Sequence, residues 1–119
     1  MGNDDYDVVL FKILTYLYGC MKRKCIFDIC EFNAVILKQS VKEEYLSDIL
    51  FMATDEGLIE GLVFTKVWGN NKIISNDLSE MRITSAGIRY LNDNSKMKEI
   101  KEYLKAIPGL VADLIRVVF

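Results

Sequence analysis

The N-terminal half of the chain contains three segments in which apolar residues recur at steps of three and four. This spacing collects the apolar side chains on one face of a helix. It predicts amphipathic helices over about residues 5–21, 28–37 and 41–56. The first half of the chain is therefore expected to be helical.

Polar residues at the helix ends support these boundaries. Asp28 with Glu31, and Ser40 with Glu43, have the spacing of an N-terminal capping pair. Gly57 suits the left-handed position after the third helix, because glycine has no Cβ to clash there. These signals make the third helix the best-defined element of the sequence.

The middle of the chain changes to a strand pattern. Val, Ile, Phe and Thr are frequent from Leu58 to Trp68, and β-branched residues return from Lys72 to Ser75. Between them, Gly69-Asn70-Asn71 tolerates positive φ. The pattern predicts a β-hairpin whose return arm breaks at Asn76-Asp77 and resumes over 81–83.

Helical spacing returns in the last third of the chain. A short helix is predicted over 85–91, followed by a polar break at 92–95. Pro108 lies inside the last helical segment, where it removes a backbone donor, so this helix must kink or split. The segment carries an apolar seam in alternating steps of three and four: Met97, Ile100, Leu104, Ile107, Val111, Leu114 and Val118.

Three helices followed by a two-stranded hairpin is the element order of a winged helix-turn-helix, an α+β fold. In that fold the third helix normally enters the DNA major groove and the hairpin is the wing. We expect a winged-helix domain over 1–94 and a C-terminal helical extension over 95–119, kinked near Pro108. The extension serves dimerisation or packing within the same domain.

Two segments carry a more specific resemblance. They are DEGLIEG at 55–61 and, after the hairpin, ITSAGIRYL at 83–91. They resemble the "EGLI…G" and "LT..G..YL" landmarks of the YjcQ-like family, small winged-helix proteins of bacteria and their phages. The resemblance covers about residues 5–105. It implies a winged-helix fold of prophage origin with no established biochemical activity, and it leaves the role of the apolar end, 107–119, open.

Composition and charge exclude several classes of function. The chain has 119 residues, of which 51% are hydrophobic and 27% charged, which is typical of one packed domain. A formal net charge of −2 gives no basic surplus for coating DNA. The sequence has no histidine, which excludes Ser-His-Asp and Cys-His catalysis and any imidazole metal site. We therefore expect neither an enzyme nor a cofactor.

The ends of the chain and its cysteines indicate a cytoplasmic protein. Residues 1–7 contain three aspartates and no basic region, unlike a secretory signal. The apolar stretch 107–119 is too short to span a bilayer. The odd set Cys20, Cys25 and Cys30 fits reduced thiols. Three thiolates leave a zinc site incomplete, so we favour buried structural thiols over a metal site.

The third helix is poorly suited to DNA. Between Ser40 and Gly57, Lys42 stands against five acidic residues. The predicted outward face consists of Glu44, Ser47, Asp48, Phe51 and Asp55. Only Lys42 and Ser47 suit contacts with DNA, and the carboxylates would repel phosphate. We therefore expect this face to be a solvated acidic surface.

Basic residues gather elsewhere, at positions 22–24 and on the hairpin arms beside Trp68. Trp68 shares a strand face with Leu62 and Phe64, so we favour packing over the core, the alternative being an exposed ring that stacks on a base or a partner protein. We expect a non-enzymatic binding protein that acts through protein–protein interaction. The alternative is a sequence-specific DNA-binding transcriptional regulator. The contact candidates are Lys22, Arg23, Lys24, Lys42, Ser47, Lys66, Trp68 and Lys72.

Beyond Pro108, apolar side chains point nearly all round the predicted helix. A small domain cannot cover every side of a terminal helix, so we expect a homodimer with a two-fold axis. In the alternative, 97–107 pack on the first helix and only 110–119 are left over. The dimerisation candidates are Ile107, Leu110, Val111, Leu114, Ile115 and Val118.

Overall fold

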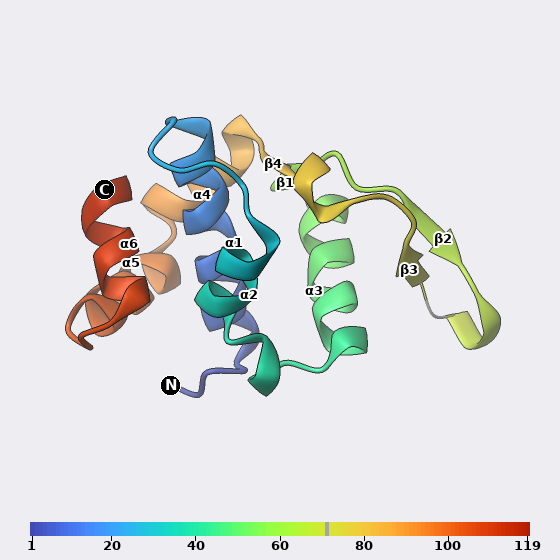
Figure 1. Cartoon of the computed structure of the whole chain (residues 1–119), viewed down its shortest axis with the longest axis horizontal. Coiled ribbons are helices and arrows are strands. Elements are labelled where there is room, and N and C mark those ends of the chain that lie inside the picture. Colours follow the sequence, from blue (N-terminus) through green and yellow to red (C-terminus); the bar gives the residue numbers. More distant parts are fainter. Residues whose placement is uncertain (71) are drawn as a thin grey trace.

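The computed structural model describes residues 1–70 and 72–119, so Asn71 of the predicted turn lies outside the described residues. The described residues form six α-helices, two two-stranded antiparallel sheets and three short 3-10 turns (Figure 1). In chain order the elements are α1 (Tyr6–Met21), α2 (Ile29–Ile36), η1 (Lys38–Ser40), α3 (Glu43–Asp55), β1 (Ile59–Glu60), β2 (Phe64–Lys66), η2 (Trp68–Asn70), β3 (Lys72–Ile74), η3 (Leu78–Glu80), β4 (Arg82–Ile83), α4 (Ser85–Asp93), α5 (Ser95–Lys105) and α6 (Leu110–Val118).

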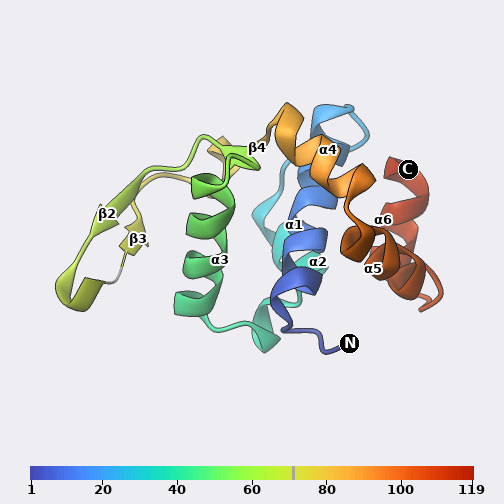
Figure 2. The same cartoon turned by 180° about the vertical axis from the view of Figure 1, so that it is seen from behind.

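Helix α1 lies at the centre of the molecule. It is buried from Val8 to Leu17, because other elements cover it on several sides. Helices α5 and α6 cover one side of α1, and α2 and α4 pack beside it. Helix α3 and the hairpin lie on the side of α1 away from α5 and α6 (Figures 1 and 2). One core cluster joins Met97, Ile100, Leu104 and Ile115 to the side chains of the first four helices.

The ends of α2 and α3 test the predicted caps. Asp28 accepts hydrogen bonds from the backbone N–H groups of Cys30 and Glu31 at 2.8 and 3.3 Å, which confirms the cap of α2. The capping box at Ser40 is wrong, since Ser40 ends a 3-10 turn and α3 begins at Glu43. The reason is Val41, whose buried side chain holds the backbone extended (φ −125°, ψ 112°) where the box needs a helix start.

The strands confirm the predicted hairpin and its interrupted return arm. Strand β2 pairs with β3, and β1 pairs with β4 after the turn η3. Asn76 joins the two sheets. Its Oδ1 accepts from the Val63 N–H at 2.9 Å and its Nδ2 donates to the Gly61 carbonyl at 2.8 Å. One side chain therefore replaces two rungs of a backbone ladder where the chain bends.

The two landmark segments touch each other. Gly57 ends α3 with φ +76°, as predicted. The Thr84 hydroxyl donates to the Gly57 carbonyl and accepts from the Gly87 N–H at 3.0 Å, which caps α4. A Cβ at Gly87 would collide with the Leu58 carbonyl. The two landmark segments thus contact each other directly and join the end of α3 to the start of α4.

The C-terminal segment splits at Pro108, and α6 folds back onto α5 and α1. Ala112, Ile115 and Val118 are buried there, and Lys22 Nζ donates to the Val118 carbonyl at 2.6 Å. The alternative that 110–119 are left over is therefore wrong. Ile115 and Val118 are also unavailable as dimer contacts, because their own chain covers them.

The break between α4 and α5 is shorter than predicted. The polar break before α5 is a single residue, Asn94, which caps α5 by accepting from the Lys96 and Met97 N–H groups.

No helix in ranges 1–70 and 72–119 has the length and apolar character to cross a membrane. The chain is an α+β protein whose element order is compatible with a winged helix.

Candidate functional site

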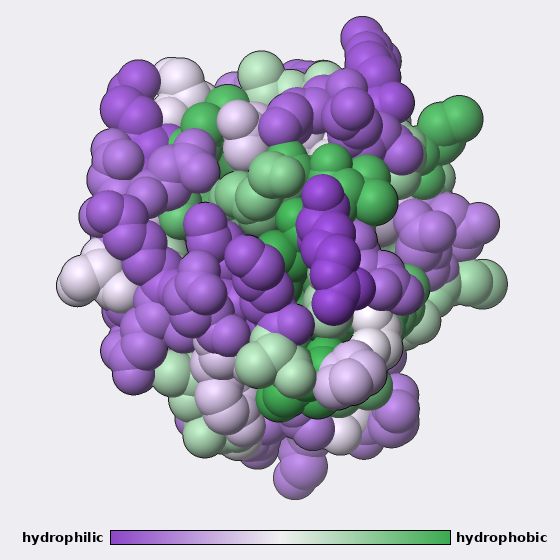
Figure 3. Space-filling model, turned by 90° about the vertical axis from the view of Figure 1, so that its left-hand side faces the viewer, coloured by the Kyte–Doolittle hydropathy of each residue, from purple (hydrophilic) through white to green (hydrophobic). Residues whose placement is uncertain are grey.

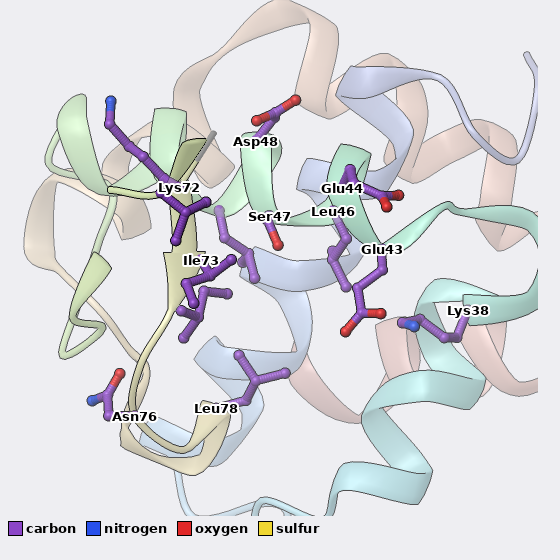
Figure 4. Close-up of a pocket in the computed structure, with 13 residues that line it drawn as sticks. Lys38, Glu43, Glu44, Leu46, Ser47, Asp48, Lys72, Ile73, Asn76 and Leu78 are labelled. Atoms are coloured by element: carbon purple, nitrogen blue, oxygen red, sulfur yellow. The ribbon is translucent and has the colours of Figure 1, made fainter. Parts of the chain in front are cut away.

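A groove of about 560 Å³ separates α3 from the hairpin (Figure 4). We call it the α3–hairpin groove. It is lined by residues of η1, α3, the hairpin arms and η3: Lys38, Glu43, Glu44, Leu46, Ser47, Asp48, Leu50, Val67, Lys72, Ile73, Ile74, Asn76 and Leu78. Figure 4 shows Glu43 and Ser47 on α3 opposite Ile73 and Leu78.

The floor of the groove is apolar. Leu46 and Leu50 are buried on α3, and Ile74 and Leu78 are half-buried on the other side. Ile73 is 50% exposed on the hairpin wall. The groove therefore presents apolar surface that its own chain leaves accessible.

The rim of the groove is more acidic than basic. Glu43, Glu44 and Asp48 line it together with two lysines. Lys72 places Nζ 3.5 Å from the centroid of the Phe51 ring, which makes a cation–π contact. Lys72 belongs to β3, and the only charged side chains of α3 are carboxylates, so the α3 side of the rim is acidic.

The structure does not bring the predicted basic contact residues together. Residues 22–24 follow α1, whereas Lys66 and Lys72 lie on the hairpin toward the opposite end of the long axis (Figures 1 and 2). Lys22 is bonded to Val118 and lies over the Tyr18 ring at 4.9 Å. Lys42 and Ser47 belong to the α3 side, so the eight candidates do not form one surface.

The prediction that Trp68 packs over the core is wrong. Leu62 is buried and Phe64 packs edge-on against Phe51 at 5.3 Å between ring centroids. Trp68, however, is 94% exposed. Strand β2 ends at Lys66, and the following 3-10 turn carries Trp68 off the strand face to the hairpin tip. Strand alternation therefore fails for this residue.

The cysteines divide into a pair and a single thiol. Cys20 and Cys25 are half-buried with their Sγ atoms 3.5 Å apart, whereas Cys30 is exposed, so the expectation of a buried thiol is wrong for Cys30. Burial and the adjacent Cys25 thiol raise the pKa of Cys20 to about 12. In the part of the chain that the structure describes, no three His, Cys, Asp or Glu side chains gather as a metal site.

The groove as a unit cannot be recognised from the sequence pattern. The acidic face of α3 is visible in the sequence pattern, but the wall residue Ile73 and the floor residues Ile74 and Leu78 are not. The available signal was the β-branched pair Ile73-Ile74, which the alternation of a strand sends to opposite faces. Only the inclination of the hairpin toward α3 tells which faces enclose a groove.

A comparison with protein families matches a family model described as "YjcQ protein" over residues 11–110. Comparisons with curated proteins and with solved structures gave no match. The matched range begins within α1, includes both landmark segments and the whole groove, and ends at the first residue of α6. Since it covers most of the sequence, the chain belongs to the YjcQ protein family.

Proposed function

We propose that this YjcQ protein is a non-enzymatic, cytoplasmic winged-helix protein of bacterial or phage origin that binds another protein through the α3–hairpin groove. The main observation that supports this proposal is the lining of the groove, which combines an apolar floor with an acidic rim. In this assignment α3 is the third helix of the winged helix and the β2–β3 hairpin is the wing.

The charge of α3 argues against DNA as the occupant of the groove. The helix contains four carboxylates and neither lysine nor arginine. Phosphate contacts and guanine readout both rely on cationic side chains. Carboxylates at the same positions would repel the phosphate backbone, so α3 entering a major groove is disfavoured.

The same surface suits a cationic, amphipathic protein segment. Apolar side chains of such a segment would cover Ile73, Ile74 and Leu78. Its lysines or arginines would meet Glu44 and Asp48. Apolar burial supplies affinity, and opposite charges at the rim supply orientation.

A peptide-binding experiment tests this proposal. The probe is a fluorescein-labelled helical peptide with leucine on one face and lysine on the other, and its glutamate counterpart is the specificity control. Fluorescence anisotropy should show binding of the lysine peptide alone. Ile73→Asp and Glu44→Lys should each weaken binding about tenfold, a loss of about 1.4 kcal/mol.

The matched control is Glu102→Lys, which makes the same charge change at an exposed site on α5. Its affinity should equal that of the wild type. Equal losses for Glu44→Lys and Glu102→Lys would show that only net charge matters and would reject the groove. Failure of the lysine peptide to bind the wild type would reject a cationic partner there.

DNA binding by the hairpin is a second candidate, favoured by one observation. Trp68 is exposed at the hairpin tip close in sequence to the exposed Lys66, a combination that can stack on a base and contact phosphate. Binding to genomic duplex fragments, titrated with salt, separates the two functions. Nanomolar binding that weakens steeply with salt and disappears in Trp68→Ala would favour the DNA-binding regulator.

We also propose a homodimer through the outer side of α6. Leu110 and Val117 are exposed there and Ile107 precedes them, while Val111 and Leu114 are half-buried. Figure 3 shows apolar side chains near the middle of this end of the molecule, surrounded and crossed by hydrophilic ones. Sedimentation equilibrium should show a dimer that Leu110→Ser with Val117→Ser converts to a monomer. A wild-type monomer at micromolar concentration would reject the dimer.

A further inference from the structure

A tight turn brings two thiols together after α1. The Arg23 N–H donates to the Cys20 carbonyl at 3.1 Å, and the Lys24 N–H donates to the Gly19 carbonyl at 2.9 Å. This is the hydrogen-bond pattern of a Schellman turn, with Arg23 in the left-handed region at φ +63°. The turn reverses the chain, so Cys25 returns to the surface of α1 beside Cys20.

The side chain of Cys25 is seated against α1. A Cβ at Gly19 would lie 3.3 Å from Cys25 Sγ, so the missing side chain at Gly19 leaves room for the thiol. The same Sγ is 4.0 Å from the Tyr16 carbonyl oxygen and 3.5 Å from Cys20 Sγ. The loop is held at its other end by the Asp28 N–H, which donates to Tyr16 Oη at 3.0 Å. The contacts at both ends of the loop therefore keep the two thiols next to each other.

Both thiols can be reached from solvent. They are half-buried and line a cavity of about 780 Å³ whose wall also carries Arg23 and Arg82. Cys30 lies outside this cavity lining and is exposed on α2.

We propose that Cys20 and Cys25 are a peroxide-oxidisable pair that closes to an intramolecular disulfide. The Sγ atoms must approach by about 1.5 Å to reach the 2.05 Å of an S–S bond. Cys25 belongs to a loop and not to a helix, so a rotation of its side chain with a small shift of the loop can supply that approach.

The reaction uses one molecule of hydrogen peroxide. Peroxide first oxidises the Cys25 thiol to a sulfenic acid and leaves as water. The sulfur of Cys20 then attacks Cys25 Sγ, the S–O bond breaks, and the Cys20 proton leaves with the hydroxyl group as a second water. Two thiols lose two electrons and two protons in total, and one peroxide is reduced to two waters. The raised pKa of Cys20 keeps its thiol protonated at neutral pH, so this thiol gives up its proton to the departing hydroxyl group as it attacks.

The test uses the full chain. Purified protein is treated with hydrogen peroxide, quenched with catalase, unfolded, and alkylated with N-ethylmaleimide. Intact mass should show a loss of two hydrogens and one maleimide adduct in place of three, since the chain has three cysteines. Peptide mapping should place the S–S bond between Cys20 and Cys25. Dithiothreitol should restore three adducts, and the melting temperature should rise with oxidation and return with reduction.

Cysteine variants give matched controls. Cys30→Ser should form the disulfide at the wild-type rate, whereas Cys20→Ser and Cys25→Ser should each lose it while keeping the wild-type circular dichroism spectrum. The mapping of the wild type needs no variant, so the proposal is testable even if a variant fails to fold. A disulfide that includes Cys30, or oxidation of Cys30 while Cys20 and Cys25 both still take maleimide, would overturn it.

Discussion

Replacing Thr15 with valine should stabilise the protein. Thr15 lies in α1 with 0% exposure, and none of the described residues gives its Oγ1 a hydrogen-bond partner. Folding therefore removes a hydroxyl group from water without replacing its hydrogen bonds. Valine keeps the β-branched shape and replaces that hydroxyl with a methyl group.

The magnitude follows from the loss of this burial penalty. An unsatisfied buried hydroxyl costs about 1–3 kcal/mol. Threonine and valine have similar volumes and similar helix propensities, so neither a cavity nor a change in helix stability offsets the gain. We expect Thr15→Val to raise the free energy of unfolding by about 1–2 kcal/mol. The melting temperature should rise by about 4 °C per kcal/mol for a domain of this size.

Thr54 is the matched control. It is also a helical threonine, but its Oγ1 donates to the Leu50 carbonyl at 2.8 Å. Thr54→Val should therefore lower the free energy of unfolding by about 1 kcal/mol. Urea denaturation of both variants measures the two shifts. A lower midpoint for Thr15→Val, or equal shifts in the two variants, would refute the reasoning and would show that Thr15 Oγ1 has a partner such as a buried water.

Three further predictions concern the backbone and a buried charge. Lys12 is 2% exposed and burial lowers its pKa, so the folded state releases this proton at lower pH than the unfolded state. Stability should therefore rise with pH between that lowered pKa and the unfolded value of about 10.4; Lys12→Met should be more stable at neutral pH and lack this slope, as urea midpoints across the pH range will show. Arg23→Gly should raise the free energy of unfolding by about 0.5–1 kcal/mol in thermal melts, because glycine adopts the left-handed conformation without strain, and an unchanged melting temperature would contradict this. Gly87→Ala should lower it by about 1–3 kcal/mol, since the added Cβ meets the Leu58 carbonyl; chemical denaturation showing wild-type stability would contradict that clash.

Local sequence patterns predicted the helices and the hairpin because those elements depend on nearby residues. The Asp28 cap, Gly57 at the end of α3 and the split at Pro108 all follow from backbone chemistry within a few positions. Ser40 has the right spacing for a cap and still fails, because burial of Val41 fixes the local backbone differently. Tertiary packing thus overrides a local signal there.

The site depends on relations that a single sequence does not contain. The acidic face of α3 was visible in the sequence, but the groove needs the hairpin at a particular inclination. Likewise, the spacing of Cys20 and Cys25 shows two nearby thiols, whereas their approach depends on the turn at Arg23 and the space at Gly19. The apolar residues of α6, which point nearly all round the helix, gave no sign that Ile115 and Val118 would be covered by their own chain.

The two hydrogen bonds of Asn76 hold the base of the hairpin, so this residue is the point about which the hairpin tilts. From Val63 to Trp68 the arm covers five residue-to-residue steps, or about 16 Å at a strand rise of about 3.3 Å. A tilt of about 10° at Asn76 would move the tip by about 3 Å over an arm of this length. Small adjustments at Asn76 are therefore amplified at Trp68. The width of the groove between the hairpin and α3 depends on this amide together with the contacts of Phe64 and Lys72 with Phe51.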